Sequence, residues 1–139
     1  MDDAELRARG RAMRRELLGP DATDELDRTT YDDDPIMQKF GDLTQDYIFG
    51  MLWARPGLDL KTRSLITVAA DIATNQTDAL ALHLRFLLRH GFTEDEIVEV
   101  ILHLMGYVGV PSARRAMVVA SRVFAEVRAE QQSSTPSED

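Results

Sequence analysis

The chain has 139 residues, of which 44% are hydrophobic and 29% are charged, and its formal net charge is −8 at pH 7. This composition is typical of a globular protein, and the excess of acidic side chains disfavours nucleic acid and anionic lipid as partners. The absence of cysteine excludes disulfides, thiolate nucleophiles and Cys-ligated metal centres.

The first half of the chain contains two predicted helices. An amphipathic helix over residues 3–18 stops at Gly19 and Pro20, and the acidic segment 20–34 is expected to be a loop. Asp34 and Pro35 form a cap and first-turn pair for a second helix, which ends before the turn at residues 55–57. Its apolar residues recur at helical spacing: Ile36, Phe40, Leu43, Tyr47, Ile48, Met51 and Leu52.

The third and fourth predicted helices are joined by a polar turn at Asn75 and Gln76. Asp59 can cap the third helix, and Thr77 or Asp78 can cap the fourth, which stops at Gly91. The spacing predicts a buried stripe on the third helix, made of Leu65, Val68, Ala69 and Ile72. A similar stripe on the fourth helix contains Leu80, His83, Leu84, Leu87 and Leu88.

Two further helices complete the predicted domain. Residues 93–96, TEDE, form a capping box for a helix that runs to about residue 108. Its apolar face contains Ile97, Val100, Ile101, Leu104 and Met105. Pro111 can start a last helix that ends near residue 130, and the polar residues 131–139 are expected to be disordered. The sequence thus predicts one all-α domain of about six helices over residues 1–130.

No stretch of the sequence is typical of a membrane or targeting segment. No apolar run approaches the ~20 residues that a transmembrane helix needs, and the N-terminal residues alternate in charge where a signal peptide would be apolar. We therefore expect a cytoplasmic protein that does not contact a membrane.

Histidines are the first candidates for chemistry. His83 lies on the predicted core side of its helix, where a histidine is more often a hydrogen-bonded core residue than a catalyst. His103 shares a helix face with Glu99 and Tyr107, four residues away on either side, so the three could form an acid/base group or simply a solvated face. His90 follows Arg89 at a helix end, where it is expected only to balance the helix dipole.

Asp71 and several arginines are the other candidates. Asp71 lies one residue from a buried stripe, where a desolvated carboxylate could carry a proton, or where it could reach water or an arginine. Arginine binds carboxylates through two parallel hydrogen bonds, which suits an acidic ligand. The arginines nearest these helix ends are Arg55, Arg63, Arg85, Arg114 and Arg115. A metal site built from His83, His103, Asp71 or Glu99 is a weak alternative, since no ligand spacing requires it.

Several segments, taken in order, resemble the gamma-carboxymuconolactone decarboxylases. They are WARPGLDLKTRSLITVA, ATNQTDALALHLR, HGFTEDEIVEVILHLMGYVGVPSA and ASRVFAE, with MRRELLG near the N-terminus. The similarity runs from about Met13 to Glu126 and so covers nearly the whole predicted domain.

The resemblance implies the alkylhydroperoxidase D-like fold, an all-helical bundle that assembles into oligomers. In the decarboxylase branch the oligomers are hexamers, so we expect a homo-oligomer, with a trimer as an alternative. The peroxidase branch carries C-x-x-C-x-x-H on the helix in question, and spacing back from His83 puts its cysteines at Thr77 and Leu80. The resemblance therefore places this chain in a cysteine-free branch that lacks thiol peroxidase chemistry.

The activity implied is decarboxylation of 4-carboxymuconolactone to 3-oxoadipate enol-lactone in protocatechuate catabolism, the beta-ketoadipate pathway. The ring C=C and lactone carbonyl of this substrate accept the electrons that CO2 leaves behind, so no cofactor and no metal is expected. The resemblance leads us to expect proton transfer by His83 or His103 and a donor or wall role for Tyr107 and Trp53. Contacts to the substrate carboxylates would come from Arg55 and Arg63, with Asp71 and Arg114 also lining the substrate site.

This chain departs from the pattern of the decarboxylases at four positions. The loop before the last helix reads YVGVPSAR where the family more usually reads close to YCGVPAAN, which changes Val108, Ser112 and Arg114. Asp71 replaces an expected apolar residue. These differences leave two alternatives: a decarboxylase, isomerase or cyclase acting on another small carboxylated lactone or keto acid in secondary metabolism, or a non-catalytic helical oligomer that binds a ligand.

Overall fold

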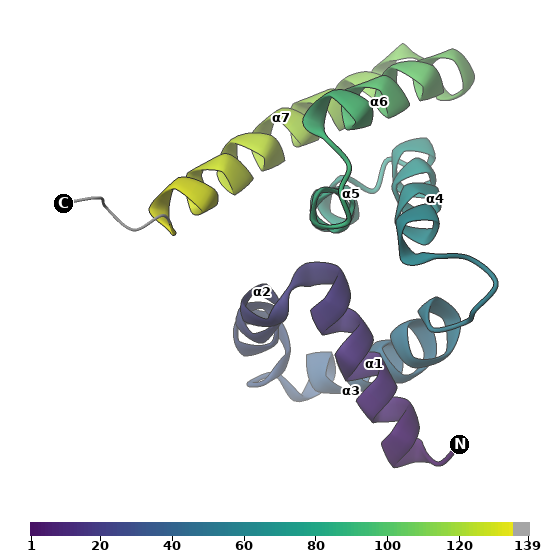
Figure 1. Ribbon diagram of the computed structural model, residues 1–139, viewed down its shortest axis with the longest axis vertical. Helices are drawn as coiled ribbons and strands as arrows, with labels where there is room; N and C mark the ends of the chain where they lie inside the picture. The colour runs from purple at the N-terminus through teal and green to yellow at the C-terminus, as the bar shows by residue number, and fades with distance from the viewer. Residues whose placement is uncertain (135–139) are drawn as a thin grey trace. The chain divides into compact units, whose positions relative to one another are not determined.

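A computed structural model describes residues 1–134, which form seven α-helices and two π-helical segments and contain no strand (Figure 1). The all-α prediction is confirmed for this part of the chain, although the number of helices exceeds the six expected. The chain divides into two compact units, Met1–Arg63 and Ser64–Asp139, here called the N-terminal and the C-terminal unit. The single domain expected over residues 1–130 stays a prediction.

Helix α1, Asp3–Leu18, has the predicted bounds. Asp2 caps it by accepting a hydrogen bond from the backbone N–H of Glu5, and the Glu5 carboxylate accepts one from the backbone N–H of Asp2. The helix ends where Gly19 adopts a φ of 95°, which a side chain would disfavour. The Gly19–Pro20 stop is therefore confirmed.

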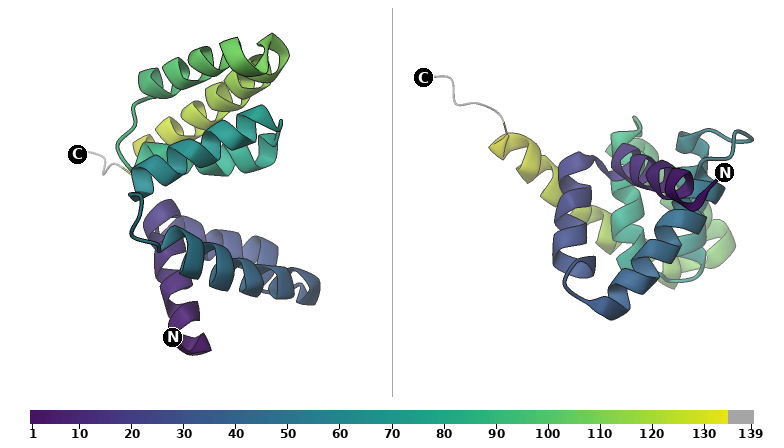
Figure 2. Two further views of the ribbon diagram at one scale, coloured as in Figure 1. Left: turned by 90° about the vertical axis from the view of Figure 1, so that its right-hand side faces the viewer. Right: turned by 90° about the horizontal axis from the view of Figure 1, so that it is seen from below.

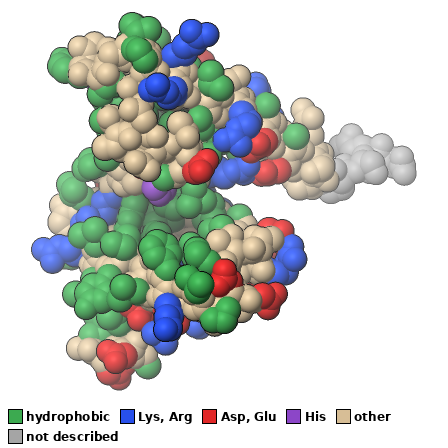
Figure 3. Space-filling view, turned by 180° about the vertical axis from the view of Figure 1, so that it is seen from behind, with side chains coloured by type: hydrophobic (Ala, Val, Ile, Leu, Met, Phe, Trp, Pro, Cys, Tyr) green, Lys and Arg blue, Asp and Glu red, His purple; other side chains and the backbone are tan. Residues whose placement is uncertain are grey.

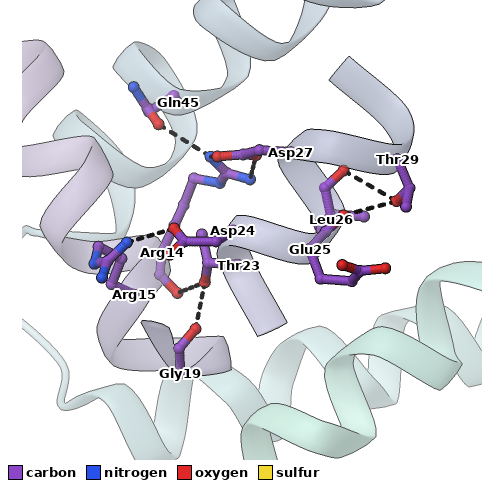
Figure 4. Close-up of polar contacts among 10 residues, drawn as sticks. All are labelled: Arg14, Arg15, Gly19, Thr23, Asp24, Glu25, Leu26, Asp27, Thr29 and Gln45. Carbon is purple, nitrogen blue, oxygen red and sulfur yellow. Dashed lines mark hydrogen bonds and ion pairs between the residues drawn. The ribbon is translucent and has the colours of Figure 1, made fainter. Parts of the chain in front are cut away.

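The acidic segment 20–34 is largely helical, so the predicted loop is wrong. Pro20 occupies the first turn of α2, Pro20–Leu26, and the π-helical segment η1, Asp27–Tyr31, follows directly. Arg14 and Arg15 of α1 pair with Asp27 and Asp24 at 2.5 Å and 2.6 Å, as the dashed lines in Figure 4 show. These partners reduce the repulsion among the acidic side chains, an effect that local sequence pattern does not reveal.

Asp34 caps α3, Pro35–Thr44, as predicted, by accepting hydrogen bonds from the backbone N–H groups of Ile36 and Met37. The helix continues as the π-helical segment η2, Gln45–Trp53. Helix α1 packs against η2 at two glycines, because a Cβ on Gly10 would lie 2.1 Å from the Gln45 carbonyl oxygen and one on Gly50 2.6 Å from that of Leu6. This close backbone approach organises the N-terminal unit.

The apolar residues of α3 and η2 are largely exposed. Figure 3 shows hydrophobic side chains gathered over the N-terminal unit on the face drawn. The large exposed side chains on these two elements are Ile36, Phe40, Leu43, Tyr47, Ile48, Met51 and Leu52. The spacing of these residues correctly predicts that the segment is helical, but it does not predict whether they are buried.

The C-terminal unit contains most of α4, Leu60–Ala73, together with α5, Thr77–Arg89, α6, Glu94–Val108, and α7, Val110–Ser133 (Figure 2). Helix α7 runs beside both α5 and α6. All four helices contribute to one apolar core. Its buried members are Val68, Ile72, Leu80, Leu84, Leu87, Ile97, Ile101, Ala113, Ala116, Val119, Ala120, Val123 and Phe124.

The predicted stripes of this unit are only partly buried. Val68 and Ile72 are buried, whereas Leu65 is half-buried against the core and Ala69 is half-buried. On α5, Leu80, Leu84 and Leu87 are buried and Leu88 is half-buried. On α6, Ile97 and Ile101 are buried, Val100 and Leu104 are half-buried, and Met105 is exposed.

The ends of these helices test the predicted caps. Asp59 and the Thr93–Glu96 capping box are confirmed, with Asp59 accepting the Thr62 backbone N–H at 2.7 Å. The cap expected at Thr77 or Asp78 is wrong, because Gln76 holds the N-cap position without a side-chain hydrogen bond. Helix α7 reaches Ser133, so the polar tail predicted from residue 131 overlaps its last turn, and residues 135–139 lie outside the described residues.

An ion-pair cluster ties α5 to α7. Arg85 donates to Glu126 and Glu130 at 2.9–3.1 Å, and the hydrogen bond with Glu130 is the main cause that raises the pKa of the guanidinium. This arginine, one of the candidates for ligand binding, is therefore engaged with α7. Among the helices described, none is long and apolar enough to cross a membrane.

Candidate functional site

Asp71 and His83 form a side-chain pair in the C-terminal unit. The turn at Asn75 and Gln76 reverses the chain, so the last turn of α4 faces the second turn of α5. Within this turn the backbone N–H of Gln76 donates to the carbonyl of Asp71 at 2.9 Å. The Nδ1 atom of His83 lies 2.5 Å from Oδ2 of Asp71, which joins a carboxylate and an imidazole across two helices.

The pair is largely withdrawn from water. The side chains of Asp71 and His83 expose 11% and 19% of their surface, and the Phe86 ring meets the imidazole edge-on at a centroid distance of 5.2 Å. Leu80, Leu84 and Ile72 nearby in sequence belong to the core. A partly desolvated carboxylate next to an imidazole with residual exposure is a common arrangement for a proton-transfer group.

The sequence predicts the location of each residue but not their pairing. His83 is placed on the core side and is half-buried, and Asp71 is placed at a boundary and is buried. The missed signal is that a short turn brings the end of one helix opposite the start of the next, so residues twelve apart can meet. Asp71 has His83, and not an arginine, as its side-chain partner in the described chain.

His103 and Tyr107 form a different kind of pair. Both are exposed on α6, their ring centroids lie 5.2 Å apart with an interplanar angle of 41°, and Tyr107 is 78% exposed. Within residues 1–134 no hydrogen bond or ion pair joins His103 to Glu99. The predicted group of three is therefore reduced to two rings, tilted against each other, on the surface of the C-terminal unit.

Trp53, Arg55 and Arg63 belong to the N-terminal unit. Trp53 is buried and stacks on Phe49 at 6.3 Å, which suits a wall role. Arg63 donates to the carbonyl oxygens of Arg55 and Leu58, at 2.9 Å and 3.2 Å, and so holds the turn before α4. The Arg55 side chain is exposed. The predicted carboxylate contacts of Arg55 and Arg63 stay predictions.

The two arginines near the start of α7, Arg114 and Arg115, differ from each other. Arg114 is exposed and forms no hydrogen bond or ion pair within the described residues. Arg115 donates to the side-chain oxygen of Asn75 at 3.0 Å and so braces the turn between α4 and α5. His90 contacts the carbonyl of Phe86 through Nδ1 at 2.9 Å, in keeping with its predicted place at a helix end. Arg114 is thus the cation of this pair that is available to a ligand.

Acidic and histidine side chains do not cluster as a metal site would require. Among residues 1–134 no group of three or more His, Asp or Glu side chains could hold a metal ion. The side chains of the Asp71–His83 pair can nevertheless accept, donate and transfer protons without one.

Comparison with known proteins identifies the type of scaffold. Residues 38–122 match the model of the carboxymuconolactone decarboxylase family. The chain is 35% identical over 127 residues to a 4-carboxymuconolactone decarboxylase of Acinetobacter baylyi, covering 91% of this chain and 92% of the relative. It is 34% identical over 115 residues to the nitrosuccinic acid decarboxylase npaB of Metarhizium robertsii, covering 83% and 78%.

Proposed function

The chain belongs to the carboxymuconolactone decarboxylase family, and from this premise we propose that it is a cofactor-independent carboxy-lyase acting on 4-carboxymuconolactone. The product would be 3-oxoadipate enol-lactone. The observation that carries the proposal is the half-buried His83, paired at 2.5 Å with Asp71 on a scaffold shared with two decarboxylases.

The reaction needs little from the protein beyond placement and one proton. When the bond from the gamma carbon to its carboxylate breaks, CO2 leaves and the electron pair moves through the ring C=C onto the carbonyl oxygen of the lactone. The resulting dienolate is then protonated on the carbon alpha to the lactone carbonyl, which fixes the remaining double bond between the beta and gamma carbons. Hydrogen-bond donors at the carbonyl oxygen of the lactone and one acid near the alpha carbon are therefore sufficient for the reaction.

Of the two histidines considered, the geometry favours His83 as that acid. A partly desolvated imidazole beside a carboxylate meets fewer competing water molecules than His103, which is exposed. We assign Trp53 a wall role, Arg55, Arg63 and Arg114 contacts to the substrate carboxylates, and Tyr107 a donor role. We also assign Asp71, which contacts His83, to the substrate site.

We also propose that the protein acts as a cytoplasmic homo-oligomer, a hexamer or a trimer, in aromatic catabolism. The exposed apolar side chains of α3 and η2 support an assembled state, because monomeric proteins rarely expose so many large apolar side chains on two consecutive elements. Mass measurement in solution tests this proposal, and a monomer at micromolar concentration contradicts it.

The direct test is incubation of the purified protein with 4-carboxymuconolactone while CO2 release and loss of the conjugated-lactone absorbance are followed. We expect turnover without added metal or cofactor, and a loss of about 10²-fold or more in kcat for His83→Gln. His90→Gln is the matched control, because that histidine lies at the C-terminal end of α5, where its Nδ1 contacts the carbonyl oxygen of Phe86. No turnover at high enzyme concentration would overturn the proposal.

A second candidate rests on the relative from Metarhizium robertsii. Its name records decarboxylation of nitrosuccinic acid, which is not a lactone, so this scaffold also serves another small carboxylated acid. Turnover of nitrosuccinate but not of the lactone would select this candidate. If neither is turned over, other small carboxylated lactones and keto acids would be tested for decarboxylation, isomerisation or cyclisation. If neither acid nor a further one reacts, and His83→Gln and His103→Gln still bind 4-carboxymuconolactone as the wild type does, the result supports a non-catalytic binding oligomer.

A further inference from the structure

We propose that Asp71 is a positioning residue that fixes the tautomer and orientation of His83, so that Nε2 is the atom that exchanges protons with the substrate. This inference rests on the proposed function for its catalytic consequence, but its structural part can be measured without any substrate. Nothing in the proposed reaction itself requires a carboxylate at residue 71.

The contact between the two side chains sets the proton position. An ionised carboxylate can only accept hydrogen bonds, so an Asp71 oxygen 2.5 Å from Nδ1 requires that Nδ1 carry the hydrogen. A neutral imidazole has one N–H, and Nε2 is then left as the acceptor. When the ring is protonated, Nε2 becomes the donor while Nδ1 keeps its hydrogen bond to Asp71.

Because the Asp71 carboxylate is buried, its contact with His83 matters for both side chains. Asp71 is 8% exposed as a residue, and a buried carboxylate is costly unless a donor satisfies it. His83 is its side-chain partner in the described chain, and no arginine or lysine contacts it. The imidazole therefore satisfies the carboxylate, and the carboxylate in return restrains rotation of the ring.

The remaining ring nitrogen is free to act. Within residues 1–134, Nε2 of His83 forms no hydrogen bond, and the side chain keeps 19% of its surface exposed. Phe86 packs edge-on against the ring and limits its tilt. The geometry thus leaves one accessible nitrogen on a ring that is held by a second nitrogen and by an aromatic neighbour.

This arrangement allows a complete proton cycle. The imidazolium, stabilised by the Asp71 carboxylate, donates its Nε2 proton to the alpha carbon of the dienolate, and a new C–H bond forms. The ring becomes neutral with the hydrogen still on Nδ1, and solvent returns a proton to Nε2 before the next turnover. Asp71 keeps its charge throughout and touches no reacting atom.

The first experiment measures the tautomer of His83 by long-range ¹H–¹⁵N correlation on histidine-labelled protein, at a pH where the ring is neutral. The chain has three histidines, so the missing signal in His83→Gln gives the assignment. We expect the Nδ1–H form in the wild type and a shift toward Nε2–H in Asp71→Asn, because an amide can donate to Nδ1. An Nε2–H ring in the wild type overturns the inference, even if the variant fails to fold.

The second experiment separates positioning from general stability. In Asp71→Asn we expect kcat to fall by about 10²-fold with KM little changed, since the loss concerns proton transfer and not binding. Asp78→Asn is the matched control, because it removes an exposed carboxylate at the start of the same helix as His83. Wild-type kcat in a folded Asp71→Asn protein overturns the catalytic part of the inference.

The two proposals can fail separately. If the wild type decarboxylates neither acid but His83 shows the Asp71-dependent Nδ1–H form, the proposed function is wrong and the positioning role stands. If the lactone is turned over and the tautomer does not depend on Asp71, the function stands and the positioning role is wrong.

Discussion

The two units of this protein are stabilised in different ways. The N-terminal unit buries few large apolar side chains, chiefly Leu17 and Trp53, and it also buries Thr23 and Gln45. The C-terminal unit buries an apolar cluster drawn from all four of its helices. Where apolar burial is small, specific polar contacts and close backbone packing have to make up more of the stability.

The polar contacts of the N-terminal unit centre on Arg14. Its guanidinium donates to Asp27 and to the side-chain oxygen of the buried Gln45 (Figure 4). It also lies 5.8 Å from the centroid of the Tyr31 ring. One side chain thereby joins α1, η1 and η2. In the C-terminal unit, by contrast, the Asp71–His83 contact lies next to an apolar core to which all four helices contribute.

The largest loss of stability that we predict comes from a substitution in the apolar core. Ile101→Ala removes a fully buried side chain at the centre of α6 and should lower the free energy of unfolding by about 2–5 kcal/mol. Chemical denaturation followed by circular dichroism measures the change. Leu102→Ala, at the next position but 44% exposed, is the control and should change stability by about 0.5 kcal/mol or less. Equal losses for the two variants would contradict the core described for this unit.

A smaller loss is expected from the polar network. Arg14→Met keeps the apolar part of the side chain but leaves Asp27 and Gln45 without their donor, which should cost about 1–3 kcal/mol. Arg28→Met breaks an exposed pair with Glu25 and is the matched control, expected to leave the denaturation midpoint nearly unchanged. If the two variants lose the same stability, the N-terminal unit does not depend on Arg14.

The parts of the fold that depend on neighbouring residues could be predicted from the sequence, whereas the parts that depend on contacts between elements could not. Helix ends with a local signal were predicted correctly, as at Asp34, Asp59 and the Thr93–Glu96 box, because a cap depends on residues within one turn. The helix and π-helical segment over residues 20–31 were missed, since two of their acidic side chains, Asp24 and Asp27, pair with arginines of α1 that precede them in the chain. Long-range ion pairs leave no periodic pattern.

In the candidate site, too, local features could be predicted from the sequence and the contact between two helices could not. Helical spacing located His83 toward the core and a family resemblance indicated its importance, but neither predicted that Asp71 would contact it. A contact across a turn depends on how two helices are rotated about their axes, and single-sequence periodicity does not fix that rotation. The predicted His103 and Tyr107 do meet, yet on an exposed face, because a helical repeat brings side chains together without determining what covers them.

The smallest effect we predict concerns the cap of α4, the helix that begins in one unit and continues in the other. The hydrogen bonds from Thr62 lower the pKa of Asp59 below its ordinary value of 3.8. A carboxyl group with a lowered pKa in the folded state stabilises that state above its unfolded pKa, and this stabilisation is lost as the pH falls through the folded value. Asp59→Ala should therefore lower the Tm at pH 7 and have a progressively smaller effect below about pH 4. Thermal unfolding of both proteins between pH 7 and pH 3 measures the difference, and a constant difference across that range would show that the Asp59 charge does not stabilise the start of α4.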